Sequence, residues 1–360
     1  MKKEIIIALF PILLLAYQDH PPMPAPGKID EYQENRYERS TKPAGPRVSS
    51  PADIFFTGDF IYWRADQEGM GFATSGWRAS VDQPVTKGKV IEPNFEFIPG
   101  FKAGFGVNLD HDFWDVYFQY TWLYTGDQEN SITADNINSP ALAASWFSQG
   151  NNPLNPDFPL INNARGRWAL RYQTLDFELG RNFFVSDWLT VRPFFGLKGM
   201  KQDQDFSIRY RRILGELDVQ QWRISQDLDY WGVGPRAGMN TNWFFSKYVS
   251  LFGDIGFSAL WGQFEAMRRD RFANIAIPAL PETTLLYTEN EFHTITPVLE
   301  IGLGLRAQAF SCAERFHYIF QAGWEFQYVW DMNQYYRIYE ATAHGGLSLM
   351  GLTIKLRVDF

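Results

Sequence analysis

The chain has 360 residues, a formal net charge of −8 and one cysteine, and 17% of its residues are aromatic. The acidic balance argues against a nucleic-acid-binding protein, and the single cysteine, Cys312, excludes an intrachain disulfide framework and a cysteine-based zinc site. A mean hydropathy of −0.28 argues against a bundle of membrane-spanning helices, because no segment beyond the N-terminus approaches the roughly 20 apolar residues that one such helix needs.

The N-terminus has the pattern of a secretory signal peptide. Lys2 and Lys3 precede an apolar run that ends at Ala16 and is too short to span a membrane. We predict a signal peptide over residues 1–16; a buried N-terminal helix is the alternative, and Pro11 argues against it. Residues 17–52 contain seven prolines and many charges, which predicts a disordered, Pro-rich periplasmic segment that acts as a spacer.

From residue 53 onward, apolar and polar residues alternate with the period of two that is typical of β-strands. We expect strands over 54–66, 95–109, 114–124, 168–180, 189–200, 230–243, 249–261, 293–305, 316–330 and 347–360, with a weaker one near 72–77. The charged stretch 201–229 predicts two more strands, joined by a turn near Gly215, and we expect both to extend beyond the bilayer. With strands that the pattern hides, the sequence predicts an all-β, transmembrane antiparallel β-barrel over residues 53–360, of about 14 strands (range 12–16), with both termini in the periplasm.

Two stretches break the alternation. We interpret residues 126–165 and 262–290 as long loops on the extracellular side, and residues 140–147 predict one short helix within the first. The apolar faces on the two sides of Gln173 are out of phase, which predicts a β-bulge there.

The segment from Phe316 to Trp330 indicates which face of the barrel meets lipid. Seven of eight alternate positions, starting at Phe316, are aromatic, and the intervening positions are mostly polar or glycine. A soluble β-sandwich or lipocalin-like barrel is the alternative, but it would have to bury more aromatic volume than its polar faces could enclose. An outer-membrane barrel exposes such a face to lipid, so we predict apolar side chains outside and polar ones inside.

Tyrosine and tryptophan concentrate near strand ends, as expected of an aromatic girdle at the membrane–water interface. We predict a lipid-facing girdle of six residues: Trp122, Tyr124, Trp261, Tyr318, Tyr328 and Trp330.

Four segments also carry a family resemblance: DFIYWRADQEGMGFA, FIPGFKAGFGVNL, YWGVGPRAGMNTNW and GLTIKLRVDF. In this order they are similar to the major-outer-membrane-protein-like (MOMP-like) barrels of environmental chlamydiae and the related pore-forming family of Legionella. The resemblance covers most of residues 53–360 and implies an outer-membrane β-barrel that acts as a porin-like channel. Phe360, at the end of an alternating strand, looks like the terminal signal that the outer-membrane assembly machinery reads.

One departure from the chlamydial members concerns cysteine. Those members are often cysteine-rich and cross-linked in the envelope, whereas this chain has only Cys312. A disulfide-linked coat role is therefore in doubt, and a single intermolecular bridge stays open.

Charges on the inward faces are where channel chemistry would lie. Seven basic and eight acidic residues are predicted there: Lys102, Arg181, Arg192, Lys198, Arg306, Lys355 and Arg357, with Glu96, Asp115, Asp176, Glu178, Asp254, Glu300, Glu325 and Asp359. The near-neutral balance predicts a water-filled pore with weak ion selectivity. The alternative is that many of these charges pair across strands and stabilise the wall.

These patterns leave two functions open. The first is an outer-membrane porin for passive diffusion of ions and small hydrophilic solutes, favoured because about 14 strands would leave a lumen that side chains do not fill. The second is a structural or adhesive surface barrel without conductance. No catalytic motif is present and the five histidines lack metal-ligand spacing, so we expect no enzyme activity, metal or cofactor. Expected partners are outer-membrane lipid, the assembly machinery, ions and small solutes, with a homo-oligomer left open.

Overall fold

The computed structural model describes residues 53–76, 87–109, 113–134, 142–146, 160–216, 218–276, 281–310, 316–337 and 344–360. The predicted signal peptide, the predicted Pro-rich segment and Cys312 lie outside these residues. The two segments therefore stay predictions. The regular elements of the described residues are all β-strands, and none of the described segments is a helix long and apolar enough to span a membrane.

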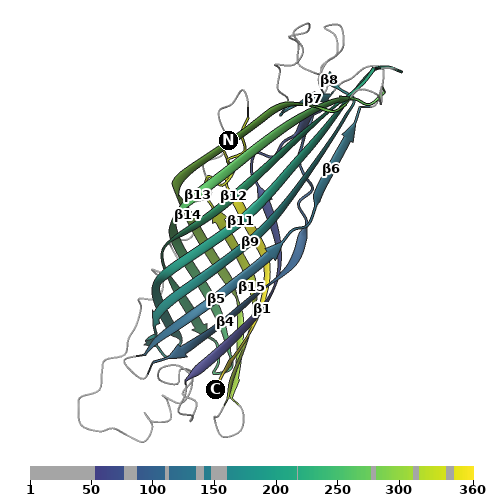
Figure 1. Ribbon diagram of the computed structural model, residues 1–360. Helices are drawn as coiled ribbons and strands as arrows, with labels where there is room; N and C mark the ends of the chain where they lie inside the picture. The colour runs from purple at the N-terminus through teal and green to yellow at the C-terminus, as the bar shows by residue number, and fades with distance from the viewer. Residues whose placement is uncertain are drawn as a thin grey trace, which may run out of the picture. The chain divides into compact units, whose positions relative to one another are not determined.

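Ten strands form a closed antiparallel barrel (Figure 1). They are β1 (Ile54–Gln67), β4 (Phe97–Asn108), β5 (Trp114–Tyr124), β9 (Asn163–Arg181), β11 (Leu189–Gly215), β12 (Asp218–Phe244), β13 (Val249–Asn274), β14 (Thr283–Phe310), β15 (His317–Val329) and β16 (Leu347–Asp359). The barrel closes because β1 pairs with both β16 and β4, and β9 pairs with both β5 and β11. The first and last strands meet with Phe55 opposite Asp359, so they begin and end at one rim.

The described residues also form six short strands besides the ten barrel strands. β10 (Phe183–Ser186) pairs with the start of β11, and β6 (Gln128–Thr133) pairs with the first residues of β9. A separate four-stranded sheet contains β2 (Ala73–Thr74), β3 (Val90–Ile91), β7 (Leu142–Ala144) and β8 (Leu160–Ile161). Figure 1 places β7 and β8 at the end of the barrel opposite the C-terminus.

The predicted strand count was wrong: the barrel has ten strands, not about 14. The turn near Gly215 is confirmed, but the stretches that flank it are not separate strands. β11 to β14 are 27, 27, 26 and 28 residues long, and each continues from an apolar-faced part into a charged part. The charges mark where a strand leaves lipid, and its backbone pairing continues past them.

The loop predicted at 262–290 is largely strand. β13 continues to Asn274 and β14 begins at Thr283, with one register irregularity at Asp270 and Arg271. The stretch 126–165 is irregular but contains β6, β7, β8 and the start of β9. The helix predicted at 140–147 was wrong in its described part, where residues 142–144 form β7.

The bulge predicted near Gln173 was also wrong, because Gln173 keeps regular partners on both sides, Trp122 and Lys201. The apolar residues change sides of the wall instead. Tyr172 and the alternate residues before it point into the barrel, whereas Leu175 and the alternate residues after it point outward.

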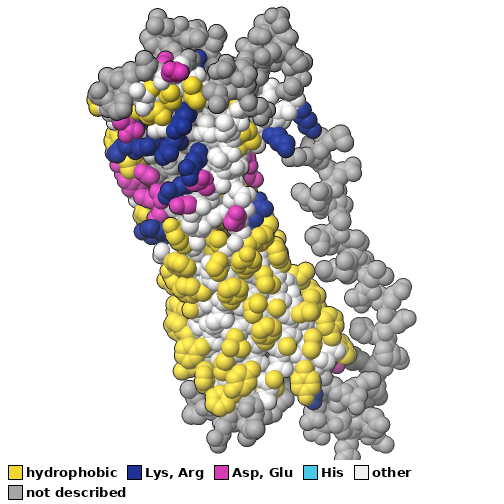
Figure 2. All heavy atoms as spheres, turned by 90° about the vertical axis from the view of Figure 1, so that its right-hand side faces the viewer, with side chains coloured by type: hydrophobic (Ala, Val, Ile, Leu, Met, Phe, Trp, Pro, Cys, Tyr) yellow, Lys and Arg dark blue, Asp and Glu magenta, His cyan; other side chains and the backbone are white. Residues whose placement is uncertain are grey.

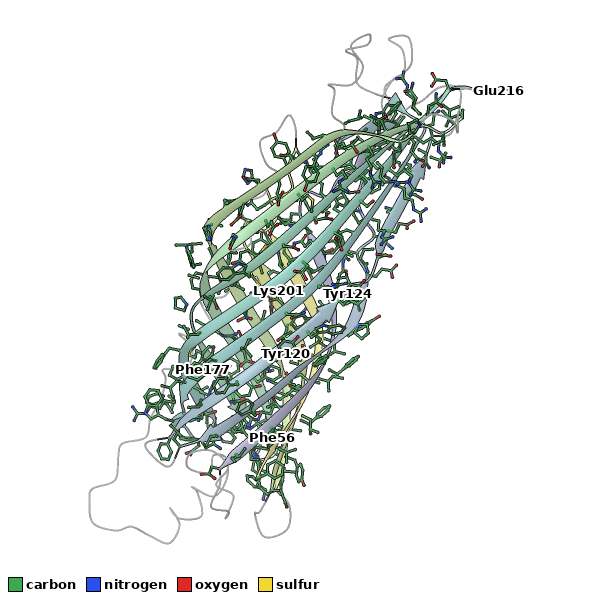
Figure 3. The ribbon with its side chains drawn as sticks, viewed as in Figure 1. Phe56, Tyr120, Tyr124, Phe177, Lys201 and Glu216 are labelled. Atoms are coloured by element: carbon green, nitrogen blue, oxygen red, sulfur yellow. The ribbon has the colours of Figure 1, made fainter. Side chains whose placement is uncertain are left out.

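The barrel therefore has two halves. The terminal half, where β1 begins and β16 ends, comprises residues 189–200 of β11, 232–244 of β12 and their register partners; the distal half comprises 201–215, 218–231 and their partners. Figure 2 shows hydrophobic side chains over the lower part of the wall and Lys, Arg, Asp and Glu gathered above it. In Figure 3, Phe56, Tyr120 and Phe177 lie toward the rim where β16 ends, Lys201 and Tyr124 midway, and Glu216 at the far tip.

The terminal half has the outer surface of a membrane-spanning wall. Phe60, Leu197 and Phe257 are about half exposed there, at 49%, 53% and 52%. A strand needs only about 9–11 residues to cross a bilayer, so strands such as the 27-residue β11 extend well beyond it.

Candidate functional site: the interior of the barrel

The predicted facing of the strands is confirmed in the terminal half. In β15, Tyr318, Phe320 and Trp324 are exposed on the outside, while Ile319 points inward and is 1% exposed. Thirteen of the fifteen charged residues predicted to face inward do project into the barrel: Lys102, Asp115, Asp176, Glu178, Arg192, Lys198, Asp254, Glu300, Arg306, Glu325, Lys355, Arg357 and Asp359. Their role in conduction stays a prediction.

Two charged residues lie elsewhere. Glu96 precedes β4 and is exposed, with its carboxylate accepting a hydrogen bond from Asn94. Arg181 points outward, with its guanidinium 4.8 Å from the centre of the Phe183 ring. Side chains alternate between the two faces of β9, so Arg181 lies on the outer face, whereas Asp176 and Glu178 lie on the inner face.

Seven side chains from five strands, β5, β9, β11, β12 and β14, form the charge cluster: Asp115, Asp176, Glu178, Arg192, Lys198, Arg236 and Glu300. The ammonium nitrogen of Lys198 lies 2.9 Å from both Asp176 and Glu300, and the side chain is fully buried. Arg236 bridges the same two carboxylates, at 2.8 and 2.9 Å. Each of these two buried cations therefore has at least two acidic neighbours.

Arg192 extends the charge cluster across the interior. Its Nε donates to Asp115 at 2.8 Å, and its Nη1 donates to Glu178 at 2.9 Å and to Asn240 at 2.7 Å. The Asn240 amide in turn donates to Asp254 at 2.8 Å. A continuous chain of polar contacts thus runs from β5 to β13.

The other side of the terminal half holds further pairs. Lys102 forms an ion pair with Glu325, and its ammonium lies 4.7 Å from the centre of the Trp63 ring. Lys355 lies 3.4 Å from Asp59, which is 3% exposed. Opposite charges are therefore matched on this side as well.

At the terminal rim, Asp359 is the centre of the contacts. It accepts hydrogen bonds from Arg357 at 2.6 and 2.8 Å and lies 2.8 Å from a ring nitrogen of His317. Arg306 donates to Asn242 at 3.2 Å.

Sequence reasoning missed Asp59 and Arg236. Arg236 lies in YWGVGPRAGMNTNW, on the same face as three glycines, and that small-residue face points inward. Asp59 lies between Thr57 and Ile61, and this mixed face gave no clear signal. The glycine face could have identified Arg236 beforehand.

The interior of the distal half is largely apolar. We call six of its side chains the aromatic core: Phe72, Trp146, Trp168, Phe206, Tyr210 and Tyr335. Phe206 lies 5.3 Å from Trp146 and 5.6 Å from Tyr335, between ring centres. Phe72, Trp146 and Tyr335 come from connections between barrel strands, so chain from outside the wall fills the inside of the barrel here.

Buried polar contacts hold these connections in place. The Tyr210 hydroxyl donates to the carbonyl of Phe72, and burial raises the pKa of Tyr210. Arg268, 1% exposed, forms an ion pair with Asp270 and donates at 2.8 Å to the carbonyls of Trp146 and Tyr336. One arginine therefore ties two connections to β13.

The predicted girdle residues lie near the two edges of the apolar wall. Tyr318 is exposed near the terminal rim, Trp261 lies beside Trp231 near the distal edge, and Tyr328 donates to Glu68. Trp122, Tyr124 and Trp330 also lie on the outer face. At the rim, the ring of Phe360 packs against Phe56 and Phe316, at 5.8 and 5.7 Å. Recognition of Phe360 by the assembly machinery stays a prediction.

Over residues 48–360 the chain matches the family described as the Legionella pneumophila major outer membrane protein precursor. The chain belongs to this family. The resemblance read from the four segments is thereby confirmed, and the protein is placed in the bacterial outer membrane. No curated protein matches the chain at the sequence level.

Solved structures with a similar fold are more distant. The outer membrane protease OmpT from Escherichia coli has 9% identity and a TM-score of 0.37, covering 88% of this chain and 99% of its own. A FadL homologue from Pseudomonas aeruginosa has 7% identity and a TM-score of 0.26, with 86% and 90% covered. The toluene transporter TbuX from Ralstonia pickettii has 8% identity and a TM-score of 0.20, with 88% and 92% covered. Their activities are not transferred to this member of the family.

Among the described residues, no group of three or more His, Cys, Asp or Glu side chains is arranged to hold a metal ion. The expectation that the protein is not an enzyme stays a prediction.

Proposed function

We propose that this protein is a closed surface barrel of the outer membrane, which acts through the distal half that extends above the bilayer. The observation that carries this proposal is the interior. The charge cluster fills the terminal half, and the aromatic core fills the distal half above it. A solute would have to pass both.

The strand number supports the same conclusion. Barrels of about eight strands are filled by their own side chains, whereas the aqueous channels of porins have about 16–18 strands. Ten strands lined by Arg192, Arg236, Lys198 and large aromatic residues lie near the filled end of this range. A barrel of about 14 strands would have favoured a porin, whereas ten strands do not.

The energetics of the charge cluster oppose conduction through it. Lys198 is fully buried between Asp176 and Glu300, so opening a path there would separate charges out of contact with water. Breaking one buried pair by removing a partner costs roughly 3–5 kcal/mol. Several such pairs lie at similar depth, so spontaneous opening would be rare.

The second candidate is the weakly selective porin for ions and small hydrophilic solutes. It is favoured by the polar, charge-balanced wall of the terminal half and by the resemblance to pore-forming barrels. For a channel of this kind, the connections that carry Trp146 and Tyr335 must leave the barrel.

Planar bilayers distinguish the two functions. We expect purified protein to give no conductance steps in salt solution. Well-resolved steps from the wild-type barrel would overturn the closed barrel and favour the porin.

If the wild-type barrel gives no conductance, a variant with a disrupted aromatic core shows which part of the interior closes it. Trp146→Ala combined with Tyr335→Ala removes aromatic core residues, whereas Tyr287→Ala removes a 53% exposed outward ring as a matched control. Conductance in the core variant alone would assign part of the seal to the aromatic core. Silence in both would assign the seal to the charge cluster.

A further inference from the structure

Arginines line the outer face of the distal half. Arg165, Arg209, Arg223 and Arg271 are directly opposite one another, on the adjacent strands β9, β11, β12 and β13. Like charges at directly opposite positions destabilise a sheet. A row of four on neighbouring strands therefore needs a compensating negative charge.

Three more arginines adjoin this row on the same face. Arg167 and Arg211 lie two residues from Arg165 and Arg209 on their strands, and Arg269 lies two residues from Arg271. We call the seven residues the arginine belt: Arg165, Arg167, Arg209, Arg211, Arg223, Arg269 and Arg271.

The protein supplies only part of the negative charge. Arg165 pairs with Glu129 at 2.5 Å and Arg167 with Asp127 at 2.8 Å. Arg223 and Arg271 share a single carboxylate, that of Glu282, at 3.6 and 3.3 Å. Three acidic residues thus serve four of the seven arginines.

The centre of the belt has no carboxylate partner within the described part of the chain. Neither Arg209 nor Arg211 has a side-chain ion pair there, and both are exposed. Partial burial, followed by the positive charges of Arg223, Arg165 and Arg211, lowers the pKa of Arg209. This is the electrostatic environment of a site that favours an anion.

The height of the belt indicates which anion is available. Lys201 and Trp231 are register partners at the outer edge of the apolar wall, and Arg209 lies eight residues further along β11. At about 3.3 Å per residue and a strand tilt of about 45°, that separation raises the belt about 20 Å above this edge. This is the headgroup region of the outer leaflet, beyond the acyl chains.

We propose that the arginine belt binds the anionic headgroup of the outer-leaflet glycolipid, lipopolysaccharide, whose sugars carry phosphate and carboxylate groups. Guanidinium groups match both of these anions with paired hydrogen bonds. The apolar wall below the belt lies on the same strands, with Leu197 and Val233 exposed to the acyl chains. One lipid can therefore contact both surfaces. The inference rests on the outer-membrane location and is independent of whether the barrel conducts.

A row of acidic residues lies between the apolar wall and the belt. Asp203, Asp229, Glu265 and Glu291 are register partners across β11 to β14 and point outward. Because these carboxylates repel phosphate, binding through the belt should strengthen when they are neutralised. Binding through shared divalent cations would instead weaken.

The test uses full-length protein in detergent with purified lipopolysaccharide and a chelator that removes divalent cations. The triple variant Arg209→Gln, Arg211→Gln, Arg223→Gln removes the two central arginines of the belt and the adjacent Arg223. The matched control also removes three positive charges, but outside the belt, by replacing Arg64, Lys89 and Lys247 with glutamine. We expect the belt variant to bind at least about tenfold more weakly, because each charge-assisted hydrogen bond contributes roughly that factor or more. The control should bind like the wild type.

Two further arms complete the test. Asp229→Asn with Glu265→Gln should tighten binding, and each variant must keep the wild-type unfolding temperature without lipid, so that lost binding is not lost folding. Equal binding by belt and control variants would overturn the proposal. So would weaker binding after Asp229→Asn with Glu265→Gln, or an equally tight, belt-dependent complex with a soluble sulfated polysaccharide, which would make a free glycan the partner.

Discussion

The terminal and distal halves of the barrel share strands, register and alternation, yet they are built inside out relative to each other. On β9, Leu175 and Phe177 point outward into the apolar wall, while Trp168 and Tyr172 point inward into the distal half. Only the surroundings change along the strand. Lipid surrounds the terminal half, so apolar side chains are stable on its outside. Water surrounds the distal half, so its apolar side chains are buried in the interior.

This inversion has a consequence for reading β-barrel sequences. An alternating pattern reports that two faces differ but not which face points inward. Where a strand passes from lipid into water, its apolar face switches sides without any break in pairing, and this switch at Gln173 imitated a bulge.

The largest effect is expected inside the terminal half. Lys198→Ala would leave Asp176 and Glu300 with one buried cation, Arg236, instead of two, which should lower the free energy of unfolding by roughly 3–5 kcal/mol. Lys201→Ala, on the exposed edge of the same strand, should change it by less than about 0.5 kcal/mol. Urea titration of the protein in lipid vesicles measures both. Equal effects would mean that the charge cluster is hydrated.

The next effect is on the outer wall of the terminal half. Leu197→Arg would place a charge in lipid and should cost roughly 2–4 kcal/mol near the middle of the bilayer. Asp205→Arg, outward on the same strand in the distal half, should change stability by less than about 0.5 kcal/mol. Folding yield into vesicles compares them directly. A costly change at Asp205 with a harmless one at Leu197 would reverse the assignment of the two halves.

A smaller effect is expected in the aromatic core. Tyr210→Phe keeps the ring but leaves the carbonyl of Phe72 without its buried donor, at a cost of about 1–3 kcal/mol. Tyr287→Phe, on the exposed side of β14, is the control and should be neutral. Thermal unfolding followed by tryptophan fluorescence measures the difference. No loss in the Tyr210 variant would mean that the connection carrying Phe72 is not held in the barrel.

The smallest effect concerns pH at the distal edge. Burial, then the neighbouring carboxylates Asp203, Glu265 and Asp205, raises the pKa of Asp229 above the unfolded-state value of about 3.9. Between these two values the folded state binds more protons, so this group's contribution to stability falls as pH rises through that window. Asp229→Asn should therefore raise the unfolding temperature above the window and flatten its pH dependence.

A series of unfolding temperatures from about pH 4 to pH 7, with a chelator present, checks the sign against the unfolded-state reference. An unfolding temperature that is lower in the Asp229 variant at neutral pH would contradict it.

The sequence predicted the terminal half well because lipid imposes one simple rule on every strand that crosses it. The aromatic outer face of β15 and its inward glutamate, Glu325, followed from alternation alone. The strand count did not follow, since a strand that continues into water gains charges such as those of Arg209 and Arg223 and resembles a turn or a loop. The length and charge of a segment cannot distinguish a strand that continues into water from a turn or a loop. Its pairing with a neighbouring strand can.

The aromatic core could not have been predicted in this way. Phe72, Trp146 and Tyr335 lie far apart in the chain, in connections without clear periodicity, and meet only because the barrel brings them together. Arg268 likewise falls in the stretch predicted to be a loop, but it is buried and donates to the carbonyls of Trp146 and Tyr336, which no local pattern places beside it. Contacts between distant connections need the folded barrel.

A cysteine scan along β11, from Phe195 to Ile208, tests the central claim most directly. With Cys312 replaced by serine, each variant in lipid vesicles is treated with a water-soluble, membrane-impermeant maleimide. We expect rapid labelling at the outward distal positions Lys201, Asp203, Asp205 and Ser207 and slow labelling elsewhere in the scan. Lipid should protect Phe195 and Leu197, and the closed interior should protect Lys198, Gln202 and Phe206. Labelling at Lys198 and Gln202 as fast as at Asp205 would reveal a water-filled interior and contradict the closed barrel.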